Sequence, residues 1–180
     1  MKKYRVQDNF LPEDDFNILR DIITSIEFPW FWTGENIRGW EKRNSPAPGQ
    51  FIHLIYDEDS PVSQFYGPYF VPILDLLECE ILSRIKLNLN HRLPEPFFSD
   101  FHIDPNPLIG ENILAHLTTA LFYINTNNGY TELEDGTKFE NVANRLVVFP
   151  ANKQHRGVTQ TDTQTRILIN FNYIKRKGNQ

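Results

Sequence analysis

The chain has 180 residues, of which 40% are hydrophobic and 23% charged, a composition that permits a packed core and argues against intrinsic disorder. Its net charge is −5, so it lacks the surplus of Lys and Arg with which a general nucleic-acid coat protein neutralises phosphates. A single cysteine, Cys79, excludes an intrachain disulfide and a multi-cysteine zinc site. No apolar run approaches the roughly 20 residues that span a bilayer, and the N-terminus lacks a signal-peptide pattern. We therefore expect a soluble, cytoplasmic protein without a membrane partner.

Two helices are expected in the first half of the chain. Apolar residues recur at helical spacing over 11–25, where Pro12 and the three acidic residues after it are typical of a helix N-terminus. A second apolar stripe predicts a helix over 69–82. Cys79 would lie inside this second helix, where a free thiol is usually buried and inert.

The segment between these helices is aromatic at its start and rich in turn residues at its end. We expect 28–50 to be irregular, followed by a strand at 51–56. Two interpretations stay open for its aromatic residues: core packing, or a wall that faces the substrate. These residues are Trp30, Phe31, Trp32 and Trp40.

From about residue 84 the pattern changes to short strands, mostly rich in β-branched and aromatic residues and bounded by Gly, Pro, Asn or Asp. The strands are predicted at 84–90, 100–104, 117–125, 129–134, 137–142, 145–150, 155–160 and 165–173. Asp135-Gly136, between two of them, is a strong signal for a two-residue hairpin turn. We therefore expect a mainly β fold of the α+β class, a sandwich or jelly roll behind a helical N-terminal layer.

No internal repeat or low-complexity tract divides the chain, and we interpret 1–180 as one domain. Residues 1–83 would form a helical and loop support region with one added strand, 84–174 the β core, and 175–180 a basic tail. Several basic residues are expected to be solvated. They are Lys42, Arg43, Arg84, Lys86 and Arg92.

A His-Ile-Asp triplet carries the first candidate metal ligands. His102 and Asp104 would point to the same face of a strand and could bind one ion together. His155, at the start of a later predicted strand, would supply a third ligand. Two histidines and one carboxylate form the facial arrangement that leaves positions of Fe(II) open to a co-substrate and O2. Isolated histidines are more often structural, and we assign three to that class: His53, His91 and His116.

A buried arginine is expected near the same ligands. Arg166 follows His155 after a polar turn, and we predict that their two strands pair as a hairpin. Alternation places Arg166 and Asn170 on one face of their strand, so the guanidinium would be buried if the histidine face points inward. A buried arginine requires an anionic partner, and a dicarboxylate ligand would supply one through a bidentate pair.

Five strings, taken in order over 84–174, are similar to a known family: FHID, LTTALFYIN, GYTELEDGT, ANRLVVFPANKQH and RILINFNY. They resemble the Fe(II)- and 2-oxoglutarate-dependent dioxygenases, in particular the prolyl-hydroxylase-like branch and its small bacteriophage-encoded members. The resemblance implies a double-stranded β-helix, which is a cupin-like jelly roll. The branch often carries a Gly-Gly-Glu-Thr run, where this chain has Gly129-Tyr130-Thr131-Glu132.

The resemblance also implies three iron ligands and a set of side chains that hold the two ends of 2-oxoglutarate. The implied iron ligands are His102, Asp104 and His155. The implied co-substrate residues are Arg166 and Tyr123 at the distal carboxylate, Asn170 in the same pocket, and Asn88 or Asn90 near the other end. No catalytic residue beyond these ligands is implied.

The implied activity is hydroxylation with Fe(II), 2-oxoglutarate and O2, with ascorbate as a reductant, releasing succinate and CO2. A peptide side chain such as proline, or a small metabolite, is favoured over nucleic acid because the chain is acidic. Alternatives are a cupin-like metal-binding protein without oxygenase activity (an isomerase or a ligand-binding module) and a silent scaffold. Arg166 and Tyr123 argue against the first alternative, and the intact ligand triad argues against the second.

Overall fold

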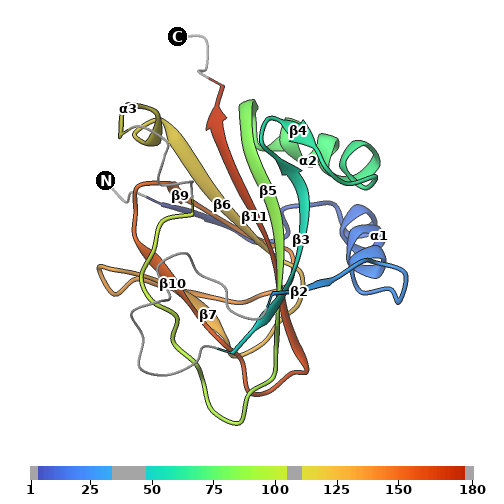
Figure 1. Cartoon of the computed structure of the whole chain (residues 1–180), viewed down its shortest axis with the longest axis vertical. Coiled ribbons are helices and arrows are strands. Elements are labelled where there is room, and N and C mark those ends of the chain that lie inside the picture. The colour runs from blue at the N-terminus through green and yellow to red at the C-terminus, as the bar shows by residue number, and fades with distance from the viewer. Residues whose placement is uncertain (1–3, 34–47, 105–110, 177–180) are drawn as a thin grey trace.

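The computed structural model describes residues 4–33, 48–104 and 111–176, which form a mostly antiparallel β fold (Figure 1). In chain order its elements are β1 Arg5–Gln7, α1 Glu13–Ile23, β2 Phe31–Thr33, β3 Gln50–Asp57, β4 Ser60–Pro61, a π-helical turn Tyr66–Phe70, α2 Val71–Leu76, β5 Cys79–His91, α3 Glu111–Leu114, β6 Leu117–Tyr123, β7 Tyr130–Leu133, β8 Lys138–Glu140, β9 Arg145–Pro150, β10 His155–Val158 and β11 Thr165–Lys175. None of the described helices is long and apolar enough to cross a membrane.

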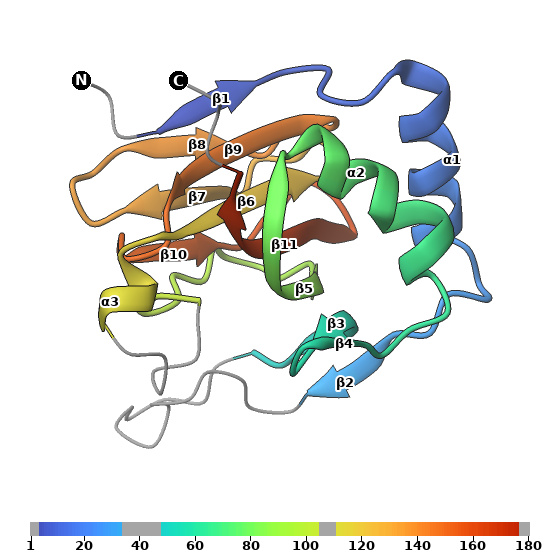
Figure 2. The ribbon, with the colours of Figure 1, turned by 90° about the horizontal axis from the view of Figure 1, so that it is seen from above.

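The strands form two antiparallel sheets that face each other. The larger sheet has the order β1-β9-β6-β11-β5-β3-β2, with β4 paired to β3, and the smaller sheet has the order β10-β7-β8. Figure 2 shows α1 and α2 on one side of β11, and β7 and β10 on the other. The predicted jelly roll behind a helical layer is therefore confirmed.

The central strand β11 is buried on both faces, for two different reasons. Ile167, Ile169 and Phe171 belong to the main hydrophobic core, which also holds side chains of α1 and α2. The alternate residues Arg166 and Asn170 line a cavity between the sheets. Strand alternation thus separates an apolar outer face from a polar inner face.

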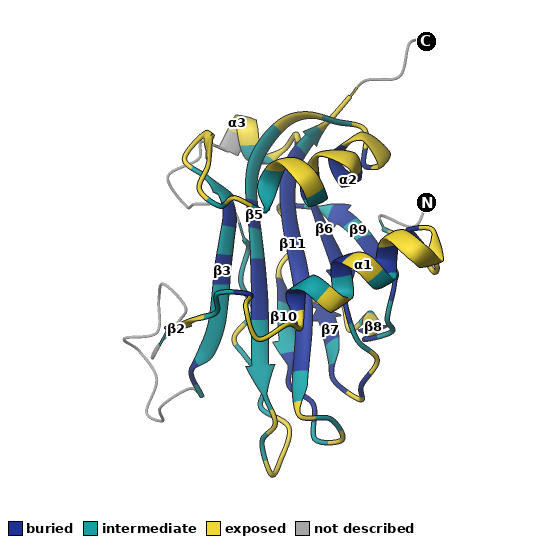
Figure 3. Ribbon diagram, turned by 90° about the vertical axis from the view of Figure 1, so that its right-hand side faces the viewer, coloured by how far each residue is buried: buried dark blue, intermediate teal, exposed yellow. Residues whose placement is uncertain are grey.

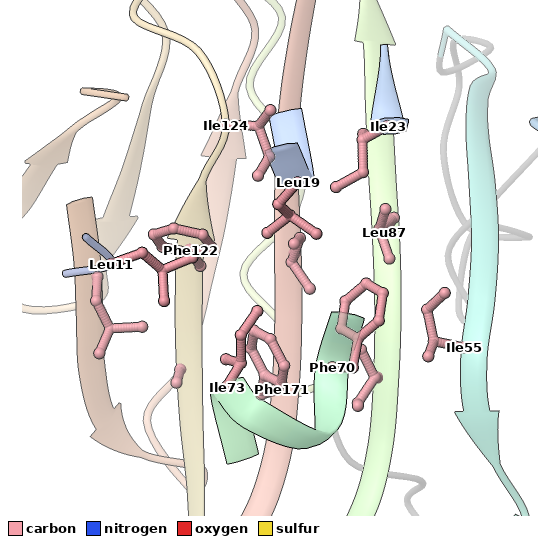
Figure 4. Close-up of a cluster of buried hydrophobic side chains, with 14 of the residues drawn as sticks. Leu11, Leu19, Ile23, Ile55, Phe70, Ile73, Leu87, Phe122, Ile124 and Phe171 are labelled. Atoms are coloured by element: carbon pink, nitrogen blue, oxygen red, sulfur yellow. The ribbon is translucent and has the colours of Figure 1, made fainter. Parts of the chain in front are cut away.

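The two main helices cover the outer face of the larger sheet (Figure 3). α1 begins after Pro12, carries three acidic residues in its first turn and buries Phe16, Leu19 and Ile23, as its spacing predicts. Figure 4 shows side chains of α1 and α2 meeting those of β3, β5, β6 and β11 in this core. This packing holds in place the strands whose opposite faces line the cavity.

The predicted helix over 69–82 is wrong in its extent. A π-helical turn leads into α2, which ends at Leu76, and Cys79 already begins β5. Glu78 has a φ of 55°, the left-handed conformation that often ends a helix. The chain then pairs with β11, so sheet formation overrides the apolar spacing, and Ile81 is exposed. Cys79 is only half-buried, but burial still raises the pKa of its thiol to about 11, which disfavours the reactive thiolate.

The region 28–50 is only partly irregular. Phe31–Thr33 forms β2, which pairs with β3, the strand predicted at 51–56. Residues 34–47 lie outside the described residues, as do 177–180 of the predicted basic tail. The first residue of that predicted tail, Lys175, ends β11, and the backbone N–H of Arg176 donates to the carbonyl of Glu78. Sequence reasoning missed β2 and also β1, which pairs with β9. Strands of three residues are too short to show alternation.

Of two further predictions for the β core, a hairpin and a short strand, the structure confirms only the hairpin. The predicted hairpin between β7 and β8 is confirmed, but its connection is longer than the predicted two-residue turn, because the last pairing is between Leu133 and Thr137. Gly136 in this loop has a φ of 84°, which glycine adopts without strain. The prediction of a strand at 100–104 is wrong, because these residues form no strand. Only an isolated bridge between His102 and His155 is formed there.

The predicted hairpin between the strands of His155 and Arg166 is also wrong. β10 pairs with β7 in the smaller sheet, whereas β11 lies between β5 and β6 in the larger sheet. The connecting turn is held where it crosses between the sheets, because Gln160 Nε2 donates to the carbonyl of Asn90 at 3.1 Å. His155 and Arg166 therefore approach the cavity from opposite sheets.

Candidate metal centre and its cavity

A cavity of about 670 Å³ lies between the two sheets. Side chains of β3, β5, β6 and β11 line it from the larger sheet, and those of β7 and β10 line it from the smaller sheet. It brings together most of the residues that the sequence analysis assigned to the site. These are Asn88, Asn90, His102, Asp104, His155, Arg166 and Asn170.

The three predicted metal ligands converge in this cavity. His102 and His155 face each other, and each backbone N–H donates to the other residue's carbonyl at 2.9 Å. Asp104 Oδ2 lies 3.2 Å from His155 Nε2, and Asp104 Oδ1 lies 3.9 Å from His102 Nε2. One ligand atom from each residue lies within 4.8 Å of the others, which is close enough for one metal ion to contact all three.

Backbone carbonyls fix the direction of both imidazoles. His102 Nδ1 lies 2.9 Å from the carbonyl oxygen of Asp100, and His155 Nδ1 lies 3.3 Å from that of Lys153. A carbonyl oxygen only accepts, so we assign a proton to each Nδ1, which leaves each Nε2 as the atom that faces a metal ion. Asp104 Oδ2 is buried without a hydrogen-bond partner, a demand that a metal cation would meet. Two imidazoles and a carboxylate fit Fe(II).

The charges around the triad favour an ionised carboxylate. Burial opposes ionisation of Asp104, but the neighbouring His155 and Arg84 outweigh it and hold the pKa of Asp104 well below its usual range. Burial also lowers the pKa of His102, and the adjacent His155 lowers it further. Asp104 therefore stays anionic and His102 neutral, the forms in which these side chains bind metals. Burial opposes protonation of His155, but the charge of Asp104 outweighs it and raises the pKa of His155, so a metal ion would displace a proton from this imidazole.

Arg166 is buried, with 3% of its surface exposed, and no carboxylate pairs with it within the described residues. Its Nη2 donates to Thr131 Oγ1 at 3.1 Å, but its Nε has no partner. Burial lowers the pKa of Arg166. An anion in the cavity would supply the missing counter-charge.

Tyr123 reaches this arginine through a threonine. The Tyr123 hydroxyl donates to Thr131 Oγ1 at 2.9 Å, and the same oxygen accepts from Arg166. The hydroxyl hydrogen of Thr131 is then free to point into the cavity, which Thr131 lines. Sequence reasoning missed Thr131, because a lone threonine in a short strand gives no signal for such a role.

Two glycines leave room for the guanidinium. A Cβ at Gly129 would lie 2.9 Å from Arg166 Cδ and 2.8 Å from the carbonyl oxygen of Val158, so no other residue fits without displacing its neighbours. A Cβ at Gly157 would lie 3.7 Å from Arg166 Nη1, which is an ordinary contact. The floor of the arginine pocket therefore depends mainly on Gly129.

The asparagines present amides to the cavity. Asn170 Oδ1 is buried without a hydrogen-bond partner, so a ligand that donates a hydrogen bond could satisfy it. Asn88 and Asn90 both line the cavity, as alternation along β5 requires. Asn90 Nδ2 already donates to Gln50 Oε1 at 3.3 Å.

Two basic residues that were expected to be solvated line the cavity instead. Alternation along β5 places Arg84 and Lys86 on the same face as Asn88. Arg84 Nη2 lies 3.6 Å from Asp104 Oδ1. Burial, and then the charge of Arg84, lower the pKa of Lys86 to about 8. The expectation is wrong because this face of β5 faces the smaller sheet rather than solvent.

An arginine braces the segment that leads to His102. Arg156, next to His155, pairs with Glu132 at 2.6 Å. Its guanidinium carbon also lies 5.1 Å from the ring centre of Phe98 and 4.6 Å from that of Phe101. These contacts link the smaller sheet to the segment that carries the other histidine.

The aromatic residues after α1 have mixed roles. Trp30 packs against Phe28, and its indole N–H donates to the carbonyl of Ile23 at 3.2 Å, which fits core packing. Phe31 and Trp32, on β2, are more than half exposed. Trp40 lies outside the described residues.

Solved structures resemble the chain along nearly its whole length. A prolyl-4-hydroxylase from Pseudomonas putida is 18% identical, with a TM-score of 0.55 over 97% of this chain and 94% of that chain. A prolyl hydroxylase from Trichoplax adhaerens, in complex with a hypoxia inducible factor peptide, is 15% identical, with a TM-score of 0.61 over 97% and 84%. The non-heme alpha-ketoglutarate-dependent epimerase SnoN from nogalamycin biosynthesis is 11% identical, with a TM-score of 0.63 over 96% and 78%.

Neither a protein-family model nor a curated protein sequence matches the chain. Because the identities to the solved structures are low, the likeness concerns the fold. The chain has the cupin-like jelly-roll fold that these hydroxylases and this epimerase share.

Proposed function

We propose that the chain is an Fe(II)- and 2-oxoglutarate-dependent dioxygenase that hydroxylates a peptide side chain or a small metabolite. The observation that carries the proposal is a buried, anion-deficient Arg166 in the same cavity as a His-Asp-His triad. A plain metal-binding cupin requires the triad alone and gives no reason to bury an unpaired guanidinium. The oxygenase uses both features.

The residues of the chain then have separate tasks. His102, Asp104 and His155 hold the iron through Nε2, a carboxylate oxygen and Nε2. Arg166 and Thr131 bind the distal carboxylate of 2-oxoglutarate, and Tyr123 orients Thr131. The amides of Asn88 and Asn170, which line the same cavity, provide further contacts to the co-substrate.

The bound iron and 2-oxoglutarate supply the oxidation: one atom of O2 enters the hydroxylated product and the other enters succinate, with loss of CO2. The task of the protein is to orient both groups and to keep their charges matched. No general base is required of the chain. One similar structure is a prolyl hydroxylase in complex with a hypoxia inducible factor peptide, and another is an epimerase from nogalamycin biosynthesis, which supports both substrate classes.

Succinate formation tests the proposal. Purified protein with Fe(II), ascorbate and 2-oxoglutarate is expected to form succinate slowly alone and faster with a peptide or metabolite pool that contains the substrate. His155→Ala and Arg166→Met should each abolish this formation. Matched controls are His116→Ala and Arg145→Met, because neither residue lines the cavity. Full turnover in His155→Ala would contradict the ligand assignment.

A further inference from the structure

The cavity has a second cationic region, which the proposed co-substrate does not use. Along β5, Asn90 pairs with Arg166 of β11, whereas Lys86 pairs with Asn170 and lies four residues away, about 13 Å along the strand. Arg84 precedes Lys86 by two residues on β5, so its side chain lies on the same cavity-facing side of the strand. Two positive side chains therefore stand at the opposite end of the inner face of β5 from the arginine pocket.

These two cations lack matching anions. Arg84 approaches Asp104 at 3.6 Å, but its Nε and Nη2 are buried without hydrogen-bond partners. Lys86 makes neither a hydrogen bond nor an ion pair within the described part of the chain. Asp57 and Glu58 also line the cavity, and the charges of Asp57 and Asp104 act on Lys86, but neither Asp57 nor Glu58 forms an ion pair with these cations, and Glu58 is exposed.

The sum of charges in the loaded site indicates that an anion is missing beside Arg84 and Lys86. The charge of Fe(II) and Arg166 together equals that of Asp104 and a 2-oxoglutarate dianion, so the loaded site is neutral without Arg84 and Lys86. Their two positive charges then remain beside the iron in a partly closed cavity, where unpaired charge is costly. A purely structural role for Arg84, holding Asp104, explains one of these cations but not Lys86.

We propose that Arg84 and Lys86 bind an anionic group of the primary substrate, a carboxylate or a phosphate, beside the metal centre. The proposal rests on the function proposed above and narrows its substrate class to anionic molecules. The two side chains would form charge-assisted hydrogen bonds with the same group. They would thereby place the rest of the substrate next to the iron.

The test uses Mn(II) in place of Fe(II), with 2-oxoglutarate present, and small anions as probes. Inorganic phosphate is titrated and its 31P relaxation measured, because an anion held near Mn(II) relaxes faster. Acetate, whose 13C relaxation is measured, is the second probe. Comparing the two probes distinguishes recognition of a carboxylate from recognition of a phosphate. The variant is Lys86→Met, with Lys138→Met as the matched control, since Lys138 is exposed on β8 and lies outside the cavity.

Wild type and Lys138→Met are expected to bind at least one probe in the presence of 2-oxoglutarate, and Lys86→Met at least about tenfold more weakly. The melting temperature of empty Lys86→Met should be unchanged or raised, because an unpaired cation is removed. A lowered melting temperature with unchanged probe binding would assign Lys86 a structural role and overturn the proposal.

Two other outcomes would also overturn it. If 2-oxoglutarate displaces both probes, the pair serves the co-substrate rather than the primary substrate. If Mn(II) and 2-oxoglutarate bind but neither probe is relaxed, no anion site exists there. Failure of Mn(II) itself to bind would refute the proposed function, and the present proposal with it.

Discussion

Replacing Arg166 by Met should have opposite effects on the empty and the loaded protein. Met has a similar length but no charge, so it can fill the space beside Gly129 without an unmet hydrogen-bond demand. The empty protein loses one hydrogen bond to Thr131 and is relieved of a buried, unpaired cation. The loaded protein loses the counter-charge of a dicarboxylate.

The magnitudes follow from these contacts. The lost neutral-acceptor hydrogen bond contributes about 1 kcal/mol, whereas an unsatisfied buried donor and a desolvated charge cost several kcal/mol. We expect the empty variant to be more stable by about 1–3 kcal/mol, a rise in melting temperature of roughly 2–10 °C. Removing one partner of a buried ion pair costs about 3–5 kcal/mol, so 2-oxoglutarate should bind at least about 100-fold more weakly.

Thermal unfolding with and without 2-oxoglutarate, in the presence of Mn(II), measures both effects. Ligand at 100 times the wild-type Kd should stabilise wild type by about 2.7 kcal/mol and the variant by about 0.4 kcal/mol or less. Arg145→Met is the control, because Arg145 pairs with Asp8 on the surface and should lose about 1 kcal/mol or less without change in 2-oxoglutarate affinity. A destabilised Arg166→Met that still binds 2-oxoglutarate would refute the reasoning.

Three further predictions concern other contacts. Gly129→Ala should lower the free energy of unfolding by about 1–3 kcal/mol in urea titrations, because its Cβ would lie 2.8 Å from the Val158 carbonyl; an unchanged value would mean that the loop relaxes freely. Tyr123→Phe should weaken 2-oxoglutarate binding roughly tenfold or less in calorimetric titrations, because about 1 kcal/mol of hydrogen bonding that orients the threonine is lost; a lower Mn(II) affinity instead would argue against this role. The hydrogen bond from Arg145 lowers the pKa of Asp8 from 3.8, so the contribution of this carboxylate to stability is present above that pH and lost as pH falls below it. Asp8→Asn should flatten this part of the stability–pH curve, and identical curves would show that the pair does not matter.

The sequence was sufficient to predict the jelly roll and several of the residues that meet in its cavity, but not Thr131, Arg84 or Lys86. Strand alternation places Arg166 and Asn170 on one face, and the His102–Asp104 triplet with His155 is recognisable by residue type and order. These features depend on local patterns, which a single sequence contains.

Features that depend on distant pairing were not predictable. Cys79 belongs to β5 because the chain pairs with β11, although the apolar spacing continues as a helix. The strand of His155 pairs with β7 rather than β11, which no turn residue reveals. Arg84 and Lys86 look like solvated charges until the smaller sheet covers their face.

The most direct test of the proposed centre is the visible absorption of the Fe(II) protein on anaerobic addition of 2-oxoglutarate. Wild type should develop a charge-transfer band that saturates at one 2-oxoglutarate per chain, because the triad leaves adjacent positions of the ion open to a chelating keto acid. His155→Ala should develop no band, and His116→Ala should match wild type. A wild-type protein without the band, or a band that survives loss of His155, would contradict the assignment of the metal centre.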